Sequence, residues 1–130
     1  MPKSSLVSLV DDDRSFRNSM ALLLDSLGYI VEDFASAADF LDSPYLAQTG
    51  CLIVDVQMPA MTGMELHRRL LERGHPIPTI LVTAKPDDVD RRRALKNGII
   101  CYLGKPVRED HLLRCIGEAL QSWTPAEPHS

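Results

Sequence analysis

The chain has 130 residues, of which 45% are hydrophobic and 25% charged, a composition typical of one compact soluble domain. This mixture excludes a disordered, collagen-like or coiled-coil chain, and apolar runs of only four or five residues are too short to span a membrane. The net charge is −4, without a stripe of basic and aromatic residues, so we expect no direct binding to nucleic acid. No apolar leader and cleavage site follow Met1, so we expect a cytoplasmic location and no membrane partner.

Five apolar runs alternate with amphipathic segments along the chain. We expect these runs to be strands, at Ser5–Val10, Tyr29–Phe34, Cys51–Val56, Ile77–Val82 and Ile99–Leu103. Four of them are rich in β-branched and aliphatic residues, which is typical of strands buried on both faces of a parallel sheet. The run at residues 29–34 is more polar, so we expect an edge strand there.

The segments between the runs have helical spacing and helical end signals. The first intervening segment places apolar residues on one helix face, namely Phe16, Met20, Leu23, Leu24 and Leu27. A similar pattern predicts a last helix, with Leu112, Leu113, Ile116, Ala119 and Leu120 on its face. Glycines 28, 74 and 98 fall where helices are expected to end. Ser36-x-x-Asp39 and Thr62-x-x-Glu65 are the pattern of capping boxes.

This alternation predicts an α/β fold made of five strand–helix units. The expected architecture is a doubly wound, five-stranded parallel sheet of the flavodoxin-like type, with strand order 2-1-3-4-5. In that order a topological switch separates strands 1 and 3, so a site is expected at the carboxyl ends of the strands. We expect residues 1–121 to form the domain and residues 122–130 to be a flexible tail or the start of a linker.

Polar side chains stand at the end of each central strand. Asp11–Asp13 follow the first strand, Asp55 lies in the third, Thr83 and Ala84 follow the fourth, and Lys105 follows the fifth. Carboxylates that meet in one crevice repel each other unless a cation neutralises them, and such oxygen ligands suit Mg²⁺. An Asp carboxylate can act as a nucleophile toward a phosphoryl group, while a lysine and a hydroxyl stabilise the transferring oxygens. The set therefore predicts Mg²⁺-assisted acceptance of a phosphoryl group.

Four motifs together resemble the receiver domain of bacterial two-component response regulators. They are the segments Leu9–Asp13, Leu52–Leu66, Ile80–Ala84 and Gly98–Pro106, and the second contains the specific D-x-x-M-P-x-M-x-G pattern. The resemblance covers about residues 5–121. It implies a phosphorylation-dependent signalling module that is no enzyme beyond its own Mg²⁺-dependent phosphorylation and dephosphorylation.

The resemblance also implies a role for each matching residue in the acidic site. Asp55 matches the phosphoacceptor. Asp11 and Asp12 match the acidic pair that holds Mg²⁺ (or Mn²⁺) together with Asp55. Gln57 stands where the family contributes a backbone carbonyl to the metal.

Further matching residues concern the phosphoryl group and the response to it. Lys105 matches the lysine that contacts the phosphoryl group, and its bond to Pro106 is implied to be cis. Thr83 and the backbone of Ala84 are implied to contact the phosphoryl group as well. Thr83 and Tyr102 match the pair of residues that switches the partner-binding surface.

Partners follow from the same resemblance. A sensor histidine kinase, or a small phosphodonor, is expected to supply the phosphoryl group. A downstream protein or output domain is expected to bind the surface formed by the fourth helix, the fifth strand and the fifth helix. A homodimer formed on phosphorylation is a further expectation.

Three other function classes fit the residues less well. A phosphohydrolase of the haloacid-dehalogenase type needs a second Asp two residues after the nucleophile, where this chain has Gln57. A nucleotide- or flavin-binding domain needs phosphate-cradling glycines after the first strand, where this chain has Asp11–Asp13. An inactive receiver that only binds partners is contradicted by the complete acidic set.

Cysteines, histidines and an arginine run are expected to have structural or surface roles. Cys51, Cys101 and Cys115 form no metal-binding spacing, so we expect three reduced residues of the core. We expect Arg91–Arg93 to be a solvated helix face, and His67, His75 and His111 to lie at the surface.

Overall fold

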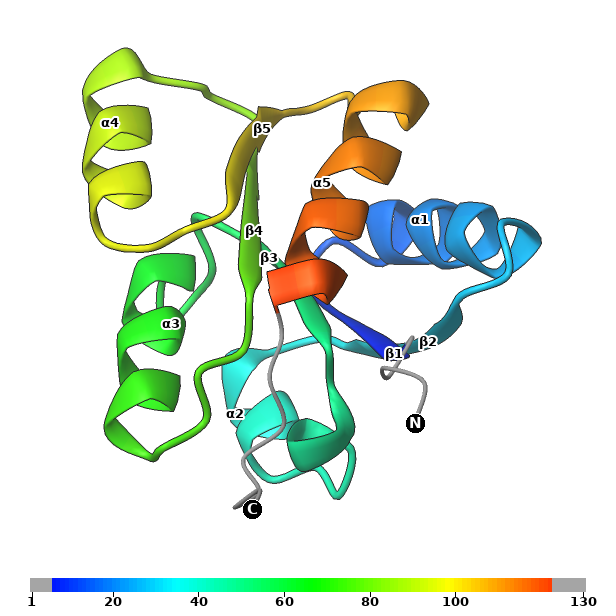
Figure 1. Cartoon of the computed structure of the whole chain (residues 1–130), viewed down its shortest axis with the longest axis horizontal. Coiled ribbons are helices and arrows are strands. Elements are labelled where there is room, and N and C mark those ends of the chain that lie inside the picture. The colour runs from blue at the N-terminus through cyan, green and yellow to red at the C-terminus, as the bar shows by residue number, and fades with distance from the viewer. Residues whose placement is uncertain (1–5, 123–130) are drawn as a thin grey trace.

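The computed structural model of the chain describes residues 6–122 (Figure 1). The strands and helices follow each other as the sequence predicts. They are β1 (Leu6–Val10), α1 (Arg14–Ser26), β2 (Ile30–Phe34), α2 (Ala37–Leu41), a 3₁₀ turn η1 (Leu46–Gln48), β3 (Cys51–Asp55), α3 (Gly63–Glu72), β4 (Thr79–Thr83), α4 (Asp88–Lys96), β5 (Cys101–Gly104) and α5 (Glu109–Ser122).

The five strands form one parallel sheet in the order β2-β1-β3-β4-β5. The predicted strand order and the predicted edge position of β2 are therefore confirmed. Figure 1 shows α1 and α5 on one side of the sheet and α2, α3 and α4 on the other. Right-handed crossovers between parallel strands produce this doubly wound arrangement.

A separate apolar core fills the space on each side of the sheet. The core under α1 and α5 includes Leu9, Ile53, Met20, Leu24 and Ile116. The core under α2, α3 and α4 includes Val54, Leu81, Phe40, Leu66 and Leu70. The central strands β1, β3 and β4 are buried along their whole length, because both of their faces contribute to a core.

The helix end signals of the sequence have their expected structure with one exception. Glycines 28, 74 and 98 have positive φ angles and follow α1, α3 and α4. Thr62 and Glu65 form a complete capping box at the start of α3. At the start of α2, the Ser36 hydroxyl accepts a hydrogen bond from the backbone N–H of Asp39. The second bond of a capping box, from the Ser36 N–H to the Asp39 carboxylate, is absent among the contacts of this helix.

The predicted ends of some elements are displaced by a few residues. β4 begins at Thr79 rather than Ile77, directly after Pro78. β5 begins at Cys101 rather than Ile99, because the Ile99 N–H closes the end of α4 by donating to the Ala94 carbonyl. Helix α5 extends through Ser122, which the sequence placed in the tail. Ser5 and the rest of the predicted tail, 123–130, lie outside the described residues.

The prediction of three reduced cysteines is wrong in the structure. Cys101 on β5 and Cys115 on α5 form a disulfide, and Cys51 is free and buried. The Cα atoms of Cys101 and Cys115 are 6.1 Å apart, within the range that a disulfide bridges. The two cysteines are 14 residues apart in the sequence, and this spacing does not indicate a disulfide. The contact exists because α5 packs across β5.

The prediction that His67 lies at the surface is also wrong. His67 is only 6% exposed, with Nε2 3.2 Å from the Asn97 carbonyl oxygen and Nδ1 3.3 Å from Thr79 Oγ1. Because a carbonyl can only accept, Nε2 carries the proton and donates it to Asn97. Burial lowers the pKa of His67, and the bond to Asn97 opposes this change only in part. This histidine links α3 to the end of α4.

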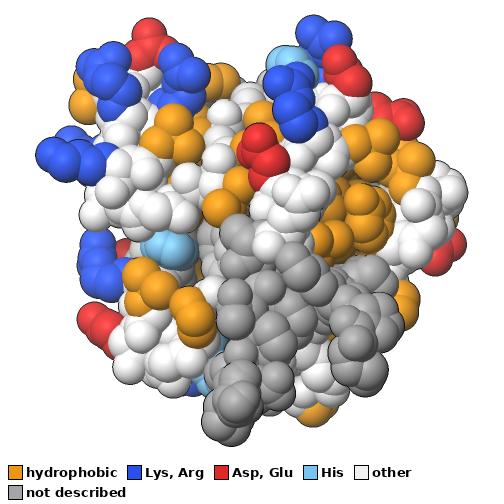
Figure 2. All heavy atoms as spheres, in the orientation of Figure 1, with side chains coloured by type: hydrophobic (Ala, Val, Ile, Leu, Met, Phe, Trp, Pro, Cys, Tyr) orange, Lys and Arg blue, Asp and Glu red, His pale blue; other side chains and the backbone are white. Residues whose placement is uncertain are grey.

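The other surface residues agree with the sequence analysis. Arg91–Arg93 are all exposed, and Figure 2 shows basic side chains gathered over α4 at the upper left. His111 is exposed and His75 is half-buried. None of the helices described here is long and apolar enough to cross a membrane.

Candidate functional site

The predicted site residues lie together at the carboxyl ends of the central strands. Asp11 directly follows β1, Asp55 is the last residue of β3, Thr83 is the last residue of β4, and Lys105 directly follows β5. Because the strands are parallel and neighbouring, these ends meet at one edge of the sheet. This edge includes the topological switch between β1 and β3.

Three carboxylates form the centre of the site. One carboxylate oxygen from each of Asp11, Asp12 and Asp55 lies within 4.8 Å of the other two. Asp11 is fully buried and Asp55 is 9% exposed, whereas Asp12 is exposed. The cluster therefore has one open side, at Asp12.

Lys105 connects two of these carboxylates. Its Nζ lies 2.9 Å from Asp11 Oδ2 and 3.2 Å from Asp55 Oδ2. The same ammonium group lies 4.1 Å from the centre of the Phe16 ring, a distance at which a cation is attracted to an aromatic face. The described contacts of Lys105 include no ion pair with Asp12. The bond between Lys105 and Pro106 is cis, as the resemblance implied.

Backbone N–H groups bind the remaining oxygens of the two buried carboxylates. The Asp13 N–H donates to Asp11 Oδ1 at 2.8 Å, and the Gln57 N–H donates to Asp55 Oδ1 at 3.0 Å. Asp13 itself caps α1 by accepting from the N–H groups of Ser15 and Phe16. Asp13 is thus directed toward the helix, while Asp11 and Asp55 face each other across the site.

For both Asp11 and Lys105, burial shifts the pKa in one direction and their ion pair shifts it in the other. Burial raises the pKa of Asp11, and the hydrogen bonds from Lys105 and the Asp13 backbone oppose this change without cancelling it. Burial alone would lower the pKa of Lys105, but its bond to Asp11 and the charges of Asp11 and Asp55 raise it overall. Lys105 is therefore a cation at neutral pH.

Thr83 and Tyr102 lie on the β4–β5 side of the site. Thr83 Oγ1 accepts a hydrogen bond from the Lys85 N–H at 3.0 Å, and the Thr83 carbonyl accepts from the Lys105 N–H at 2.8 Å. Ala84, directly after β4, is exposed. The hydroxyl of the half-buried Tyr102 accepts a hydrogen bond from the Asp87 N–H at 3.2 Å. Tyr102 thereby links β5 to the N-terminal cap of α4.

A cavity of about 150 Å³ lies beside Tyr102, between α3, α4 and β4. Its lining includes Leu81, Ala94 and Met64 together with the Tyr102 ring. This space adjoins the strand that ends at Thr83. A movement of the Tyr102 side chain therefore has room on the inner side of β5.

The loop after Asp55 passes close to the strand it has just left. The Gly63 N–H donates to the Val56 carbonyl at 3.0 Å, and a Cβ atom at Gly63 would lie only 2.6 Å from the Asp55 carbonyl oxygen. Only glycine fits this approach. The glycine of the D-x-x-M-P-x-M-x-G pattern therefore holds the loop against the end of β3.

Two further residues, Phe16 and Arg17, support the site without a signal in the sequence for this role. Phe16 was placed on the apolar face of α1 without a contact to Lys105. Arg17 donates from Nη1 to the Asp11 carbonyl at 2.7 Å and from Nε to Asp33 at 3.1 Å, and nothing in its surroundings in the sequence indicated this. A surface hollow of about 500 Å³ lies elsewhere, between α1 and β2, and none of the predicted site residues lines it.

The acidic cluster fits a small, hard cation. Carboxylate oxygens are preferred ligands of Mg²⁺, which takes one or two carboxylates and keeps several waters. Three carboxylate oxygens within 4.8 Å of one another can surround one such ion, some directly and some through water. The exposed position of Asp12 gives the ion a path from solvent.

The site combines a pair of acidic residues, an Asp at the end of a central parallel strand and a lysine that faces this Asp. This combination defines a phosphoaccepting signalling domain of the two-component type. The family comparison agrees over nearly the whole chain. The profile of the response regulator receiver domain matches residues 7–117, and the chain belongs to this family. It is thus a phosphoaccepting signalling module and not a conventional enzyme.

Individual relatives show how much of a protein this chain represents. It is 37% identical over 119 residues to the response regulator protein TodT of Pseudomonas putida, covering 92% of this chain and 52% of TodT. A low-resolution structure of the response regulator StyR matches with 41% identity and a TM-score of 0.81, over 89% of this chain and 59% of StyR. The crystal structure of FixJ-N matches with 30% identity and a TM-score of 0.83, over 95% and 98% of the two chains. The chain spans about half the length of the curated relatives it matches.

Proposed function

We propose that Asp55 is the residue that accepts the phosphoryl group. The observation that carries this proposal is its position: Asp55 ends the central strand β3, with Lys105 Nζ 3.2 Å from one of its oxygens and the acidic pair beside it. Lys105 and a backbone N–H bind one oxygen each on both Asp11 and Asp55, but Asp11 is completely buried. Asp55 is slightly exposed and is therefore the accessible nucleophile of the two.

The proposed reaction transfers one phosphoryl group to a carboxylate oxygen. An oxygen of Asp55 forms a bond to phosphorus while the bond between phosphorus and the donor atom breaks, and the donor leaves with the electron pair of that bond. Lys105 already contacts the Asp55 carboxylate, so a small movement brings its ammonium to a phosphoryl oxygen. The Thr83 hydroxyl and the backbone of Ala84 bind the other phosphoryl oxygens from the end of β4.

We further propose that the cation of the site is Mg²⁺ or Mn²⁺. Asp11, Asp12 and Asp55 would hold it with the backbone carbonyl of Gln57. Bound there, it supplies positive charge that offsets the negative charge of the phosphoryl oxygens. Asp12 would offer its carboxylate from the exposed side of the cluster, and Asp11 and Asp55 would offer theirs from the buried side.

The response to phosphorylation is proposed to pass through Thr83 and Tyr102. A phosphoryl group on Asp55 offers the Thr83 hydroxyl a strong acceptor, which draws that side chain toward β3. The cavity beside Tyr102 then accepts the ring, and the bond between its hydroxyl and the Asp87 N–H is lost. The surface formed by α4, β5 and α5, called the output surface below, changes as a result.

The proposed partners follow from the family and the output surface. A sensor histidine kinase, or a small phosphodonor, supplies the phosphoryl group in the cytoplasm. The output surface binds a downstream protein or an output domain. Phosphorylation also favours a homodimer of the chain. Residues 1–121 act as the receiver, and residues 122–130 are a tail or the start of a linker.

Incubation with acetyl phosphate and Mg²⁺ tests the assignment of Asp55. Intact-mass spectrometry is expected to show one added phosphoryl group on the wild type, and none when EDTA replaces Mg²⁺. Asp55→Asn is expected to take up none. Asp13→Asn is the matched control, because Asn also caps helices, and it is expected to be labelled normally. Normal labelling of Asp55→Asn refutes the assignment.

Nuclear magnetic resonance with beryllofluoride, which mimics a phosphoryl group, tests the proposed response. Chemical shifts are expected to change at the site and across residues 86–121 in the wild type. In Thr83→Ala, the changes are expected to stay near the strand ends. Equal changes across residues 86–121 without the Thr83 hydroxyl contradict this part of the proposal.

A further inference from the structure

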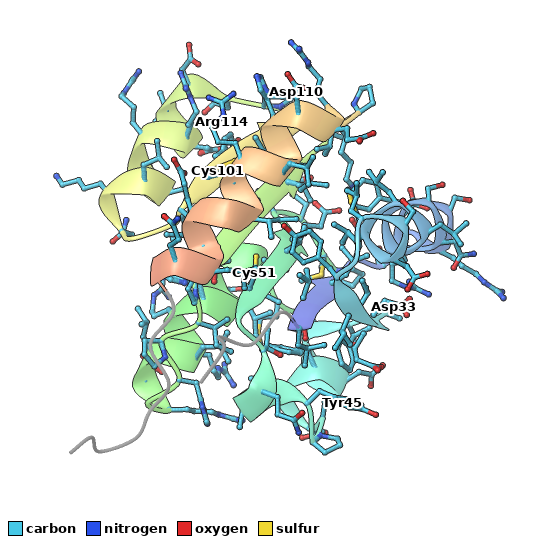
Figure 3. The ribbon with its side chains drawn as sticks, turned by 45° about the vertical axis from the view of Figure 1, so that its right-hand side comes forward. Asp33, Tyr45, Cys51, Cys101, Asp110 and Arg114 are labelled. Atoms are coloured by element: carbon cyan, nitrogen blue, oxygen red, sulfur yellow. A yellow bond between two sulfur atoms is a disulfide. The ribbon has the colours of Figure 1, made fainter. Side chains whose placement is uncertain are left out.

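A disulfide between Cys101 and Cys115 links β5 to α5, two of the elements that form the output surface. Neither cysteine belongs to the phosphoacceptor site. Cys101 is the first residue of β5 and is half-buried, whereas Cys115 on α5 is 6% exposed. Figure 3 labels Cys101 beside α5, close to Arg114. Cys51 is fully buried in β3.

A surface hollow of about 200 Å³ opens at the pair. It is lined by Cys101, Leu103, His111, Arg114, Cys115 and Glu118. The hollow gives a small thiol or disulfide reagent access to the pair from the side of the half-buried Cys101. The charged groups that face them are Arg114, which favours a thiolate, and Glu118, whose Oε1 lies 3.8 Å from Cys101 Sγ and disfavours one.

The link is adjacent in sequence to the proposed switch residue, with the two side chains on opposite faces of β5. Cys101 directly precedes Tyr102, whose hydroxyl contacts the start of α4. In the disulfide form Lys105 is paired with Asp55, which is the arrangement before a phosphoryl group is present. A covalent bond between β5 and α5 opposes movement of these two elements relative to each other. The disulfide therefore favours the unphosphorylated arrangement over an arrangement in which the output surface has changed.

We propose that Cys101 and Cys115 are a reversible dithiol–disulfide couple whose oxidation restrains the output surface. The coupling to the surface rests on the proposed function, whereas the redox chemistry of the pair does not. Disulfides in reducing compartments are mostly transient and redox-sensing. The proposed cytoplasmic location therefore makes this pair a sensor rather than a permanent crosslink.

The reaction is thiol–disulfide exchange with a small disulfide such as oxidised glutathione. The Cys101 thiolate, the more exposed of the two, attacks one sulfur of the reagent, forms a mixed disulfide and releases the first reduced thiol. The Cys115 thiolate then attacks Cys101 Sγ, forms the internal disulfide and releases the second. Two cysteine thiols are oxidised and the reagent's disulfide is reduced, and the two cysteine protons end on the two released thiols.

Equilibration of the folded chain in glutathione buffers of increasing oxidation tests the chemistry. Free thiols are then alkylated and located by peptide mass spectrometry. Cys101 and Cys115 are expected to lose reactivity together and to regain it fully on return to reduced glutathione. Cys51 serves as the internal control and is expected to stay thiol and unreactive. A pair that stays reduced at every ratio, or that is reduced only after denaturation, overturns the proposal.

Beryllofluoride binding to the oxidised and reduced wild type tests the coupling. The oxidised form is expected to bind it at least about fivefold more weakly, the lower end of usual couplings between sites. Because such coupling is reciprocal, beryllofluoride is expected to shift the half-oxidation ratio of the pair by the same factor, toward the dithiol. Cys101→Ala is expected to bind like the reduced wild type under both conditions, and Cys51→Ala to retain the difference.

Failure of the coupling can be told apart from failure of the proposed function. Equal beryllofluoride affinity in both redox states overturns the restraint of the output surface, even when the pair titrates. Absence of binding to the reduced protein overturns the proposed function and the coupling with it. The glutathione titration needs no phosphoryl group, so it judges the redox couple in either case.

Discussion

Replacing Asp12 by Asn is expected to stabilise the metal-free domain. Asp12 faces two carboxylates within 4.8 Å, and Lys105, which is paired with both of them, compensates about one of their charges. The remaining repulsion equals that between two unit charges about 5 Å apart, which is about 0.8 kcal/mol in water and about 3.3 kcal/mol at an effective dielectric constant of 20. Because Asp12 is exposed, we expect the lower end, about 1 kcal/mol.

Urea denaturation in EDTA measures this gain, and Mg²⁺ is expected to reverse the order of the variants. Mg²⁺ at ten times its dissociation constant adds about 1.4 kcal/mol to the wild type by binding linkage, and Asp12→Asn loses most of this addition with one ligand. Asp13→Asn removes a charge from the same loop but keeps the helix cap, so it is expected to retain the Mg²⁺ response. An Asp12→Asn variant that is no more stable in EDTA, or that gains as much from Mg²⁺ as the wild type, refutes this reasoning.

Three further predictions concern the loop, the buried histidine and the lysine. Gly63→Ala is expected to lower the free energy of unfolding by about 2 kcal/mol in urea denaturation, because its Cβ would lie 2.6 Å from the Asp55 carbonyl oxygen. The lowered pKa of His67 means that the unfolded chain binds its proton more readily, so stability is expected to decrease as the pH falls from 7.5 to 5.5, by at most about 1.4 kcal/mol per pH unit for this one proton. His67→Gln is expected to flatten that slope. Lys105→Arg is expected to keep the fold but to slow acetyl phosphate labelling, since a planar guanidinium cannot replace a compact ammonium between Asp11 and Asp55.

Each of these predictions has a contradicting result. A loss below about 0.5 kcal/mol in Gly63→Ala, the range of neutral surface changes, means that the loop can move away at little cost. The same pH slope in His67→Gln as in wild type and in the exposed-site control His111→Gln assigns the slope to other groups. A Lys105→Arg variant labelled at the wild-type rate shows that the geometry of the cation at this position does not matter.

The fold and the site could be predicted because they depend on patterns that are local in the sequence. The buried strands Cys51–Asp55 and Thr79–Thr83 are continuous apolar runs, and their order and parallel direction follow from the alternation with helices. Once the strands are parallel, polar residues that follow them must meet. The meeting of Asp11, Asp55 and Lys105 therefore followed from topology, without knowledge of any side-chain contact.

The features that could not be predicted depend on contacts between distant segments. The contact of Cys101 with Cys115 depends on how α5 lies across β5, and an odd number of cysteines favoured the wrong answer. The burial of His67 is compensated by its bond to the Asn97 carbonyl, a backbone group that carries no signal in the sequence. Phe16 fitted the apolar face of a helix, and its contact with Lys105 requires the three-dimensional structure.

Chemical mapping of the phosphorylated residue tests the central claim most directly. The wild type is labelled with acetyl phosphate and Mg²⁺, and the acyl phosphate is reduced with borohydride, which converts a phosphorylated aspartate to homoserine. Peptide mass spectrometry then reads which aspartate has changed. We expect homoserine at position 55 alone, and none in a sample labelled without Mg²⁺. Homoserine at Asp11, Asp12 or Asp13, or an unchanged Asp55 in a protein that has gained a phosphoryl group, contradicts the account.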